Sequence, residues 1–176
     1  MDAAHWHLVL THVPVVGMVF ALLLLAVAVV TVNGSVRRLG LAAVVLVALL
    51  ALPTYFTGEP AVEVVERLPG VSEPLIDRHE DAATTSLVAV EVVGALALAG
   101  LAFTARATRV PTWLVAGMLG LTAVSAGLMG WTANLGGQIR HTEIRTGFSA
   151  GAPMDPGIRA EPRPGARAPA GEKHDD

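Results

Sequence analysis

The sequence predicts an all-α protein, a bundle of four transmembrane helices. Apolar residues make up 53% of the 176 residues and charged residues only 15%, which is too little charge for an ordinary water-soluble domain. None of the apolar runs alternates with the period of two that a membrane barrel needs. Four runs approach or exceed the roughly 20 residues with which a helix crosses a bilayer: 8–32, 39–56, 82–105 and 112–135.

The links between these runs predict the orientation of the bundle. The first link carries Arg37 and Arg38, the third carries Arg106 and Arg109, and neither contains an acid. Because short arginine-rich links stay on the cytoplasmic side, we expect an up-down-up-down bundle with both termini outside. The second link, also outside, is long and acidic, with Glu59, Glu63, Glu66, Glu73, Asp77, Glu80 and Asp81.

The acidic link has a helical pattern of its own. Val62, Val65 and Leu68 recur at helical spacing before the chain reaches Pro69. This pattern predicts a short amphipathic helix on the outer surface. A second helix start at Ser72 is expected to run without a break into the third membrane helix.

Beyond Gly147 the composition changes to Pro, Gly, Ala and charged residues. Such a segment buries too little apolar area to fold. We therefore expect a transmembrane domain over 1–147 and a disordered outer C-terminal tail over 148–176.

Composition and motifs exclude several classes of function. The chain has no cysteine, which excludes disulfides, c-type haem attachment and thiolate metal sites. A net charge of -3 without a basic patch argues against nucleic acid as a partner. The common nucleotide-binding, serine-hydrolase and zinc-protease motifs are missing, so we assign no catalytic residue and do not expect an enzyme. The expected surroundings are the lipid bilayer and other proteins, and a homo-oligomer stays open.

Histidines are the most informative residues of the sequence. In the predicted orientation they gather at the outer helix ends. His5 and His12 are seven residues apart and share one helix face, which we expect to look into the bundle. His7 lies off that face beside Trp6 and is expected to be a surface group. Two further outer histidines are His79 and His141.

Two stripes at helical spacing predict the packing faces of the last two membrane helices. Small residues on such a stripe let helix backbones approach closely. Each stripe contains one histidine. Together with the face of His5 and His12 on the first helix, we therefore expect three helices each to aim a histidine inward. The first stripe is His79, Ala83, Ser86, Val90, Gly94 and Ala97, and the second is Gly120, Ala123, Gly127, Gly130, Asn134, Gly137 and His141.

Three functions are compatible with these histidines. One is axial ligation of haem b, which takes imidazoles from facing helices: His12 with His79 or His141, and His5 nearby. Another is a divalent metal ion held by His5, His79 and His141, with Glu80 or Glu143 close by. Either cofactor would serve electron transfer with other membrane or periplasmic redox proteins. The alternative is an accessory or scaffold subunit of a membrane complex, with interfacial histidines and no cofactor.

Glu91 is a separate signal, since acids inside an apolar helix are costly and usually face protein or water. It shares a face with Glu80, Thr84 and Leu87, which suggests a proton path inward from the outer side. The alternative is a protonated Glu91 that is hydrogen-bonded to Ser125 or to another hydroxyl of the fourth membrane helix.

Three segments carry a resemblance to a known family. "LTHVPVVGMVFALLLL", "RHEDAA" and "NLGGQIRHTEIR" resemble small bacterial four-helix (tetraspan) membrane proteins that form a domain of unknown function. The resemblance covers most of residues 5–145, although the family's usual phenylalanine after the helix-1 histidine, here His12, is replaced by Val13. It implies a four-helix membrane protein with a histidine near the outer end of the first helix and no settled activity. Together with the orientation from the links, we expect a bacterial inner membrane protein with periplasmic termini. The positions it marks are His12, His79, Gly136, Gly137 and His141.

Overall fold

The structure is a computed structural model, and it describes residues 2–107 and 109–145. Those residues form helices and no strand. The four long helices are each long and apolar enough to cross a membrane, which confirms the predicted number of spans. In chain order the elements are α1 (Ala3–Thr31), α2 (Gly34–Phe56), α3 (Gly58–Val65), α4 (Glu73–Thr104), α5 (Thr112–Arg140) and the 3₁₀ turn η1 (Thr142–Ile144).

Short polar side chains set the first helix boundaries. Asp2 accepts a hydrogen bond from the His5 amide and caps α1. The helix therefore begins at Ala3, five residues before the predicted apolar run. α1 ends at Val32, which adopts a left-handed conformation with φ 56°. Asn33 then accepts from the Ser35 and Val36 amides and starts α2, so two residues suffice to turn the chain.

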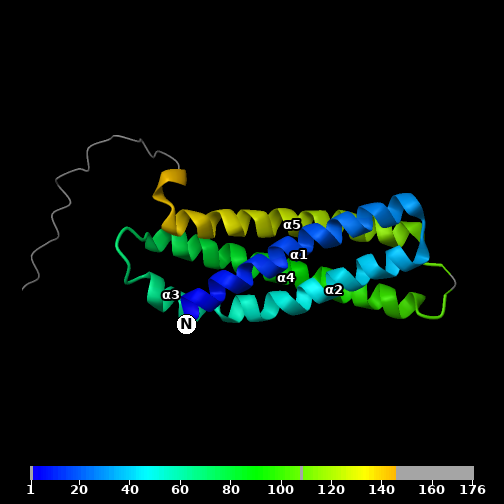
Figure 1. Cartoon of the computed structure of the whole chain (residues 1–176), viewed down its shortest axis with the longest axis horizontal. Helices are drawn as coiled ribbons and strands as arrows, with labels where there is room; N and C mark the ends of the chain where they lie inside the picture. Colours follow the sequence, from blue (N-terminus) through cyan, green and yellow to red (C-terminus); the bar gives the residue numbers. More distant parts are fainter. Residues whose placement is uncertain (1, 108, 146–176) are drawn as a thin grey trace, which may run out of the picture.

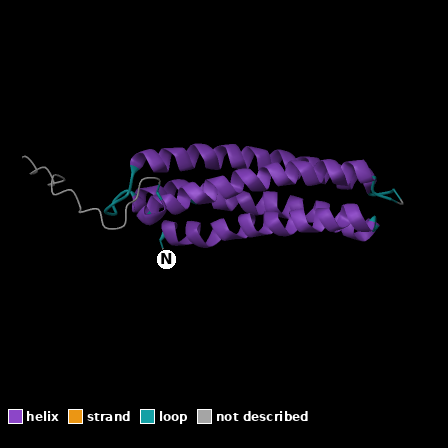
Figure 2. Ribbon diagram, turned by 90° about the horizontal axis from the view of Figure 1, so that it is seen from above, coloured by secondary structure: helices purple, strands orange, loops and turns teal. Residues whose placement is uncertain are grey.

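The four long helices form a ring. α1 packs against α2 and α5, and α4 packs against the same two helices, so that α1 and α4 are diagonal. Figure 1 shows the α1–α2 and α4–α5 links at one end of the bundle and α3 at the other, beside the start of α1. Figure 2 shows the same helices from a second direction. We call these ends the arginine end and the α3 end.

The core is a narrow column of apolar side chains along the middle of the ring. Met18, Leu25, Leu41 and Val44 are among its fully buried members. Gly94 lets α4 approach α2 closely, because a Cβ atom there would collide with Ala48. Many apolar side chains on the outside of the long helices are exposed, as lipid contact requires.

The predicted packing face is right for α4 and wrong for α5. Along α4, Ser86, Val90, Gly94 and Ala97 are buried, as expected. Along α5 the small-residue stripe faces outward, and its members from Gly120 to Asn134 are exposed. The buried face of α5 carries larger residues at the same spacing, which fill the column: Val115, Met118, Thr122, Ser125 and Met129.

Most remaining elements follow the prediction. The helix expected in the acidic link is present as α3. The restart after Ser72 is also present, since α4 continues through His79 without a break. The predicted tail over 148–176 lies outside the described residues.

Candidate functional site

His7 lies on the inward face of α1, at the α3 end. It shares that face with the buried residues Pro14 and Met18. Its Nδ1 lies 3.1 Å from the Thr54 carbonyl oxygen and 3.2 Å from the Thr57 hydroxyl. A carbonyl can only accept, so Nδ1 carries the proton and donates it to α2. The expectation that His7 is a surface group is therefore wrong.

Gly58, the first residue of α3, lies within van der Waals distance of the His7 ring. A Cβ atom at this position would lie 3.5 Å from Cε1 of His7. The Thr57 hydroxyl donates to the Thr54 carbonyl as well, at 2.8 Å. The turn between α2 and α3 therefore wraps the imidazole with one carbonyl, one hydroxyl and one glycine.

His79 occupies the corresponding position between α4 and α5. Its Nδ1 donates to the Thr132 carbonyl over 3.0 Å, and the ring is half-buried. Gly136 gives the ring its space, because a Cβ atom there would lie only 3.0 Å from Cε1 of His79. Two turns further along α4, the Ser86 hydroxyl is joined to the hydroxyl of the same Thr132 over 2.8 Å.

His7 and His79 belong together, although they come from diagonal helices. Both lie at the α3 end of the bundle, within the first two turns of α1 and α4. Each ring donates Nδ1–H to a main-chain carbonyl of a neighbouring helix. Each therefore keeps a lone pair on Nε2, the nitrogen that remains able to accept a proton or ligate a metal.

The other outer histidines face away from this pair. His5 and His12 do share a face of α1, as predicted, but that face is exposed, and the expectation that it looks into the bundle is wrong. His12 uses its Nδ1 on the Leu8 carbonyl of its own helix, at 2.7 Å. His141 is the exposed cap residue directly after α5 and pairs with Glu143 over 2.7 Å.

The Glu143 carboxyl lies outside the long helices. A hydrogen bond from its own main-chain N–H, together with the bond to His141, lowers the pKa of Glu143 below its ordinary value of 4.5. The sets His5–His79–His141 and His12–His141 are thus not brought together, and the described residues contain no group of three or more His, Asp or Glu side chains placed to hold a metal ion.

The two predicted carboxylates are also apart from the pair. Glu80 is exposed. Glu91 is half-buried in α4, and its Oε1 is buried without a hydrogen-bond partner. No hydrogen bond joins it to Ser125, so the protonated Glu91–Ser125 arrangement is not found.

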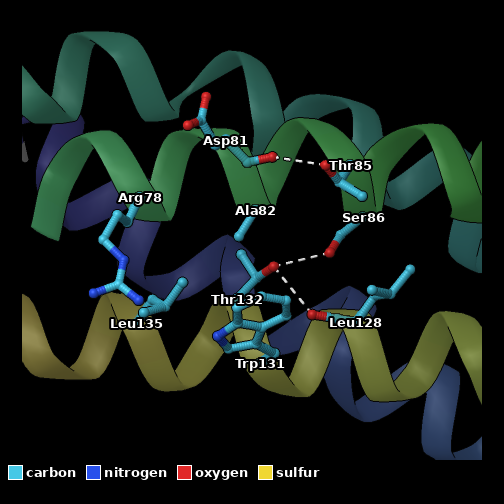
Figure 3. A pocket seen from close by; sticks show the side chains of 9 residues that line it. All are labelled: Arg78, Asp81, Ala82, Thr85, Ser86, Leu128, Trp131, Thr132 and Leu135. Atoms are coloured by element: carbon cyan, nitrogen blue, oxygen red, sulfur yellow. Dashed lines mark hydrogen bonds between the residues drawn. The ribbon is translucent and has the colours of Figure 1, made fainter.

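A half-open groove lies between α4 and α5, next to the Thr132 that accepts from His79. Figure 3 shows its wall, with Ser86 and Thr132 joined at its floor and Asp81 bonded through its carbonyl to Thr85. The groove has a volume of about 300 Å³. Thr132 connects it to the imidazole, because its hydroxyl faces Ser86 while its carbonyl receives the His79 proton.

Sequence reasoning missed the main-chain carbonyls of Thr54 and Thr132 that accept from the two histidines. The available signal is indirect: a threonine inside or at the end of an apolar run turns its hydroxyl toward protein, and so indicates which side of α2 or α5 faces the bundle. The chain matches no family model, no curated protein and no solved structure. The resemblance to tetraspan membrane proteins therefore stays a prediction.

Proposed function

We propose that the chain is a multi-pass protein of the bacterial inner membrane that crosses it up-down-up-down, with both termini and α3 in the periplasm. Four helices of membrane-spanning length and composition support this placement. The direction is supported by the links, because arginine-rich links without acids stay cytoplasmic.

The absence of native cysteine makes this orientation easy to test. Ser35→Cys places a thiol at the arginine end, and Glu63→Cys places one in α3 at the opposite end. In intact cells we expect a membrane-impermeant maleimide to label the Glu63→Cys variant and to spare Ser35→Cys until the cells are lysed. The reverse pattern would invert the proposed topology.

For the α3 end we propose that His7 and His79 ligate a redox-active transition metal, either as a bare copper or iron ion or as the iron of haem b. The protein would then exchange electrons with a membrane or periplasmic partner. The observation that carries this proposal is the shared hydrogen-bond pattern, in which Nδ1–H of both rings donates to a main-chain carbonyl. Carbonyl-bound Nδ1–H is the usual arrangement of histidines that ligate metals through Nε2, and imidazole suits copper and iron.

Metal analysis and an absorption spectrum of the full chain in detergent test the proposal. We expect bound copper or iron, or a Soret band after haem supplementation, in the unmodified protein. The signal should disappear in His7→Gln and in His79→Gln. It should persist in His5→Gln and His12→Gln, which change exposed histidines of the same protein end. A metal content near zero together with no Soret band would refute the proposal.

One observation favours a second function, that of an accessory or scaffold subunit without a cofactor. His7 and His79 each already connect their helix to a neighbour, and the described part of the chain offers no third ligand beside them. In this second function the imidazoles fasten the bundle, and the protein acts through a partner. Co-purification of a stable partner with the metal-free protein would favour it.

A further inference from the structure

The arginine end holds several cations and no acid. The sequence contains no Asp or Glu between Asp2 and Glu59, nor between Glu91 and Glu143, and these two stretches build the whole end. The positive charge of this end is therefore not balanced by a nearby carboxylate of the stretches that form it. The cations are Arg37, Arg38, Arg106 and Arg109.

Arg37 is the unusual member of this group because it is only 3% exposed. Its guanidinium donates to the carbonyls of Ala28 and Val110 and to the hydroxyl of Thr112. All three partners are neutral. The only ion pair among the described residues joins His141 and Glu143 at the other end of the bundle. Burial of a charge without an opposite charge is strongly unfavourable, so Arg37 calls for an anion.

The bonds of Arg37 leave room for such an anion. A guanidinium has five N–H donors, and three are used, one each on Nε, Nη1 and Nη2. One donor remains on Nη1 and one on Nη2. Two donors on one guanidinium are the number that binds two oxygens of a phosphate in a bidentate way.

A cavity adjoins the buried arginine. Its volume is about 420 Å³, within the range of small-molecule sites. Arg109 adds a second, exposed guanidinium to its wall. The wall consists of Val32, Gly34, Arg37, Arg109 and Val110, from both links of the arginine end.

We propose that this cavity binds a phosphate group, with Arg37 as the buried anchor and Arg109 as a rim contact. The group is either the phosphodiester of an anionic phospholipid headgroup or free inorganic phosphate. The site is separate from the histidine pair and does not depend on the function proposed for it. The bound phosphate supplies the negative charge that the protein itself lacks around Arg37.

Thermal unfolding of the full chain in a neutral detergent tests the site with three probes: phosphatidylglycerol, inorganic phosphate, and diacylglycerol as a lipid without phosphate. Arg109→Gln removes the rim charge without disturbing Arg37. Arg106→Gln is the matched control, because it makes the same charge change in the same link outside the cavity wall. We expect Arg109→Gln to need about tenfold more probe for half-maximal protection than the unmodified protein or Arg106→Gln.

The arms of the experiment separate the sources of phosphate. Protection by phosphatidylglycerol alone identifies a lipid headgroup, and protection by inorganic phosphate identifies the free ion; both support a phosphate site when Arg109→Gln weakens them. Protection should fall as salt rises. Equal protection by diacylglycerol, equal dependence in the three proteins, or no protection by any probe would overturn the proposal.

Discussion

At both ends of the bundle a nitrogen side chain donates to main-chain carbonyls of neighbouring helices, but the two ends use different residues. Arg37 at the arginine end spends three donors on α1, the α4–α5 link and α5. At the α3 end, His7 and His79 spend one donor each, on α2 and α5. The same task of joining helix ends is therefore done by one strong contact and by two weaker ones.

The difference between arginine and histidine separates the roles of the two ends. Arginine stays charged at every physiological pH and has no lone pair to offer. A histidine that donates Nδ1–H keeps Nε2 available for a proton or a metal. The contact at the arginine end is thus always charged and attracts anions. At the α3 end, the protonation or metal ligation of the histidines can change.

The largest expected effect is at the arginine end, with Arg37→Met. Methionine fills part of the volume but leaves the Ala28 and Val110 carbonyls and the Thr112 hydroxyl without their donor. Each of the two buried carbonyls that loses its donor costs about 1–3 kcal/mol, and removal of the uncompensated charge offsets part of that cost, so we expect a net loss of about 2–4 kcal/mol in unfolding free energy. Denaturant titration in mixed micelles measures it.

Arg106→Met is the control for that experiment. It removes an exposed arginine from the same end of the bundle, and we expect a change within about 0.5 kcal/mol. If Arg37→Met lowered the unfolding free energy no more than this control, the Arg37 hydrogen bonds would not be stronger than those of His7 and His79.

A smaller effect of mixed sign is expected from two glycines of α5. In Gly136→Ala the new Cβ would lie 3.0 Å from Cε1 and 3.3 Å from Nδ1 of His79, so the ring has to shift and its bond to Thr132 weakens. We expect a loss of about 1–2 kcal/mol. Gly130→Ala meets no atom within 4 Å and should gain about 0.5–1 kcal/mol from helix propensity. Parallel unfolding titrations compare them, and equal signs would show that the recess at Gly136 does not hold the imidazole.

The sequence was sufficient to predict the four membrane-length helices, the helix in the acidic link and the inward face of α4. It could not predict how α1 is rotated. A soluble helix shows its inward face by its apolar stripe, but α1 is apolar on every side. The shared face of His5 and His12 follows from their spacing, whereas its direction depends on packing against α2 and α5.

For α5 the sequence did contain a usable signal. The outward glycine stripe and the inward stripe have the same spacing, so spacing alone cannot separate them. Hydroxyls inside an apolar helix, however, favour contact with protein, and Ser125 and Thr132 both lie on the bundle side. Placing these hydroxyls inward first would have oriented α5 and located the partner of His79.

The contribution of the His7 hydrogen bond to the unfolding free energy can be measured with His7→Leu, and we expect it to be small. The variant removes the donor to the Thr54 carbonyl, but the Thr57 hydroxyl still donates to that oxygen. We therefore expect only about 0.5–1 kcal/mol of destabilisation, well below Arg37→Met. His12→Leu is the control, since its Nδ1 also meets a carbonyl but on an exposed face of its own helix, and no measurable change is expected. A loss at His7 as large as at Arg37 would make the two ends equivalent.

The smallest effect is expected just beyond α5, where Glu143 and His141 pair. Because folding lowers the pKa of Glu143 below 4.5, its contribution to local order is complete above that pH and is lost as the pH falls through the lowered value. The protection of residues 142–144 against hydrogen exchange, taken relative to the intrinsic rate at each pH, should therefore fall in mild acid, while the protection of α4 and α5 stays unchanged. Glu143→Gln should remove the pH dependence and leave the turn folded, because Arg145 still donates to the carbonyls of Gln138 and Ile139. An acid response that survives in Glu143→Gln would assign it to another group of the α3 end.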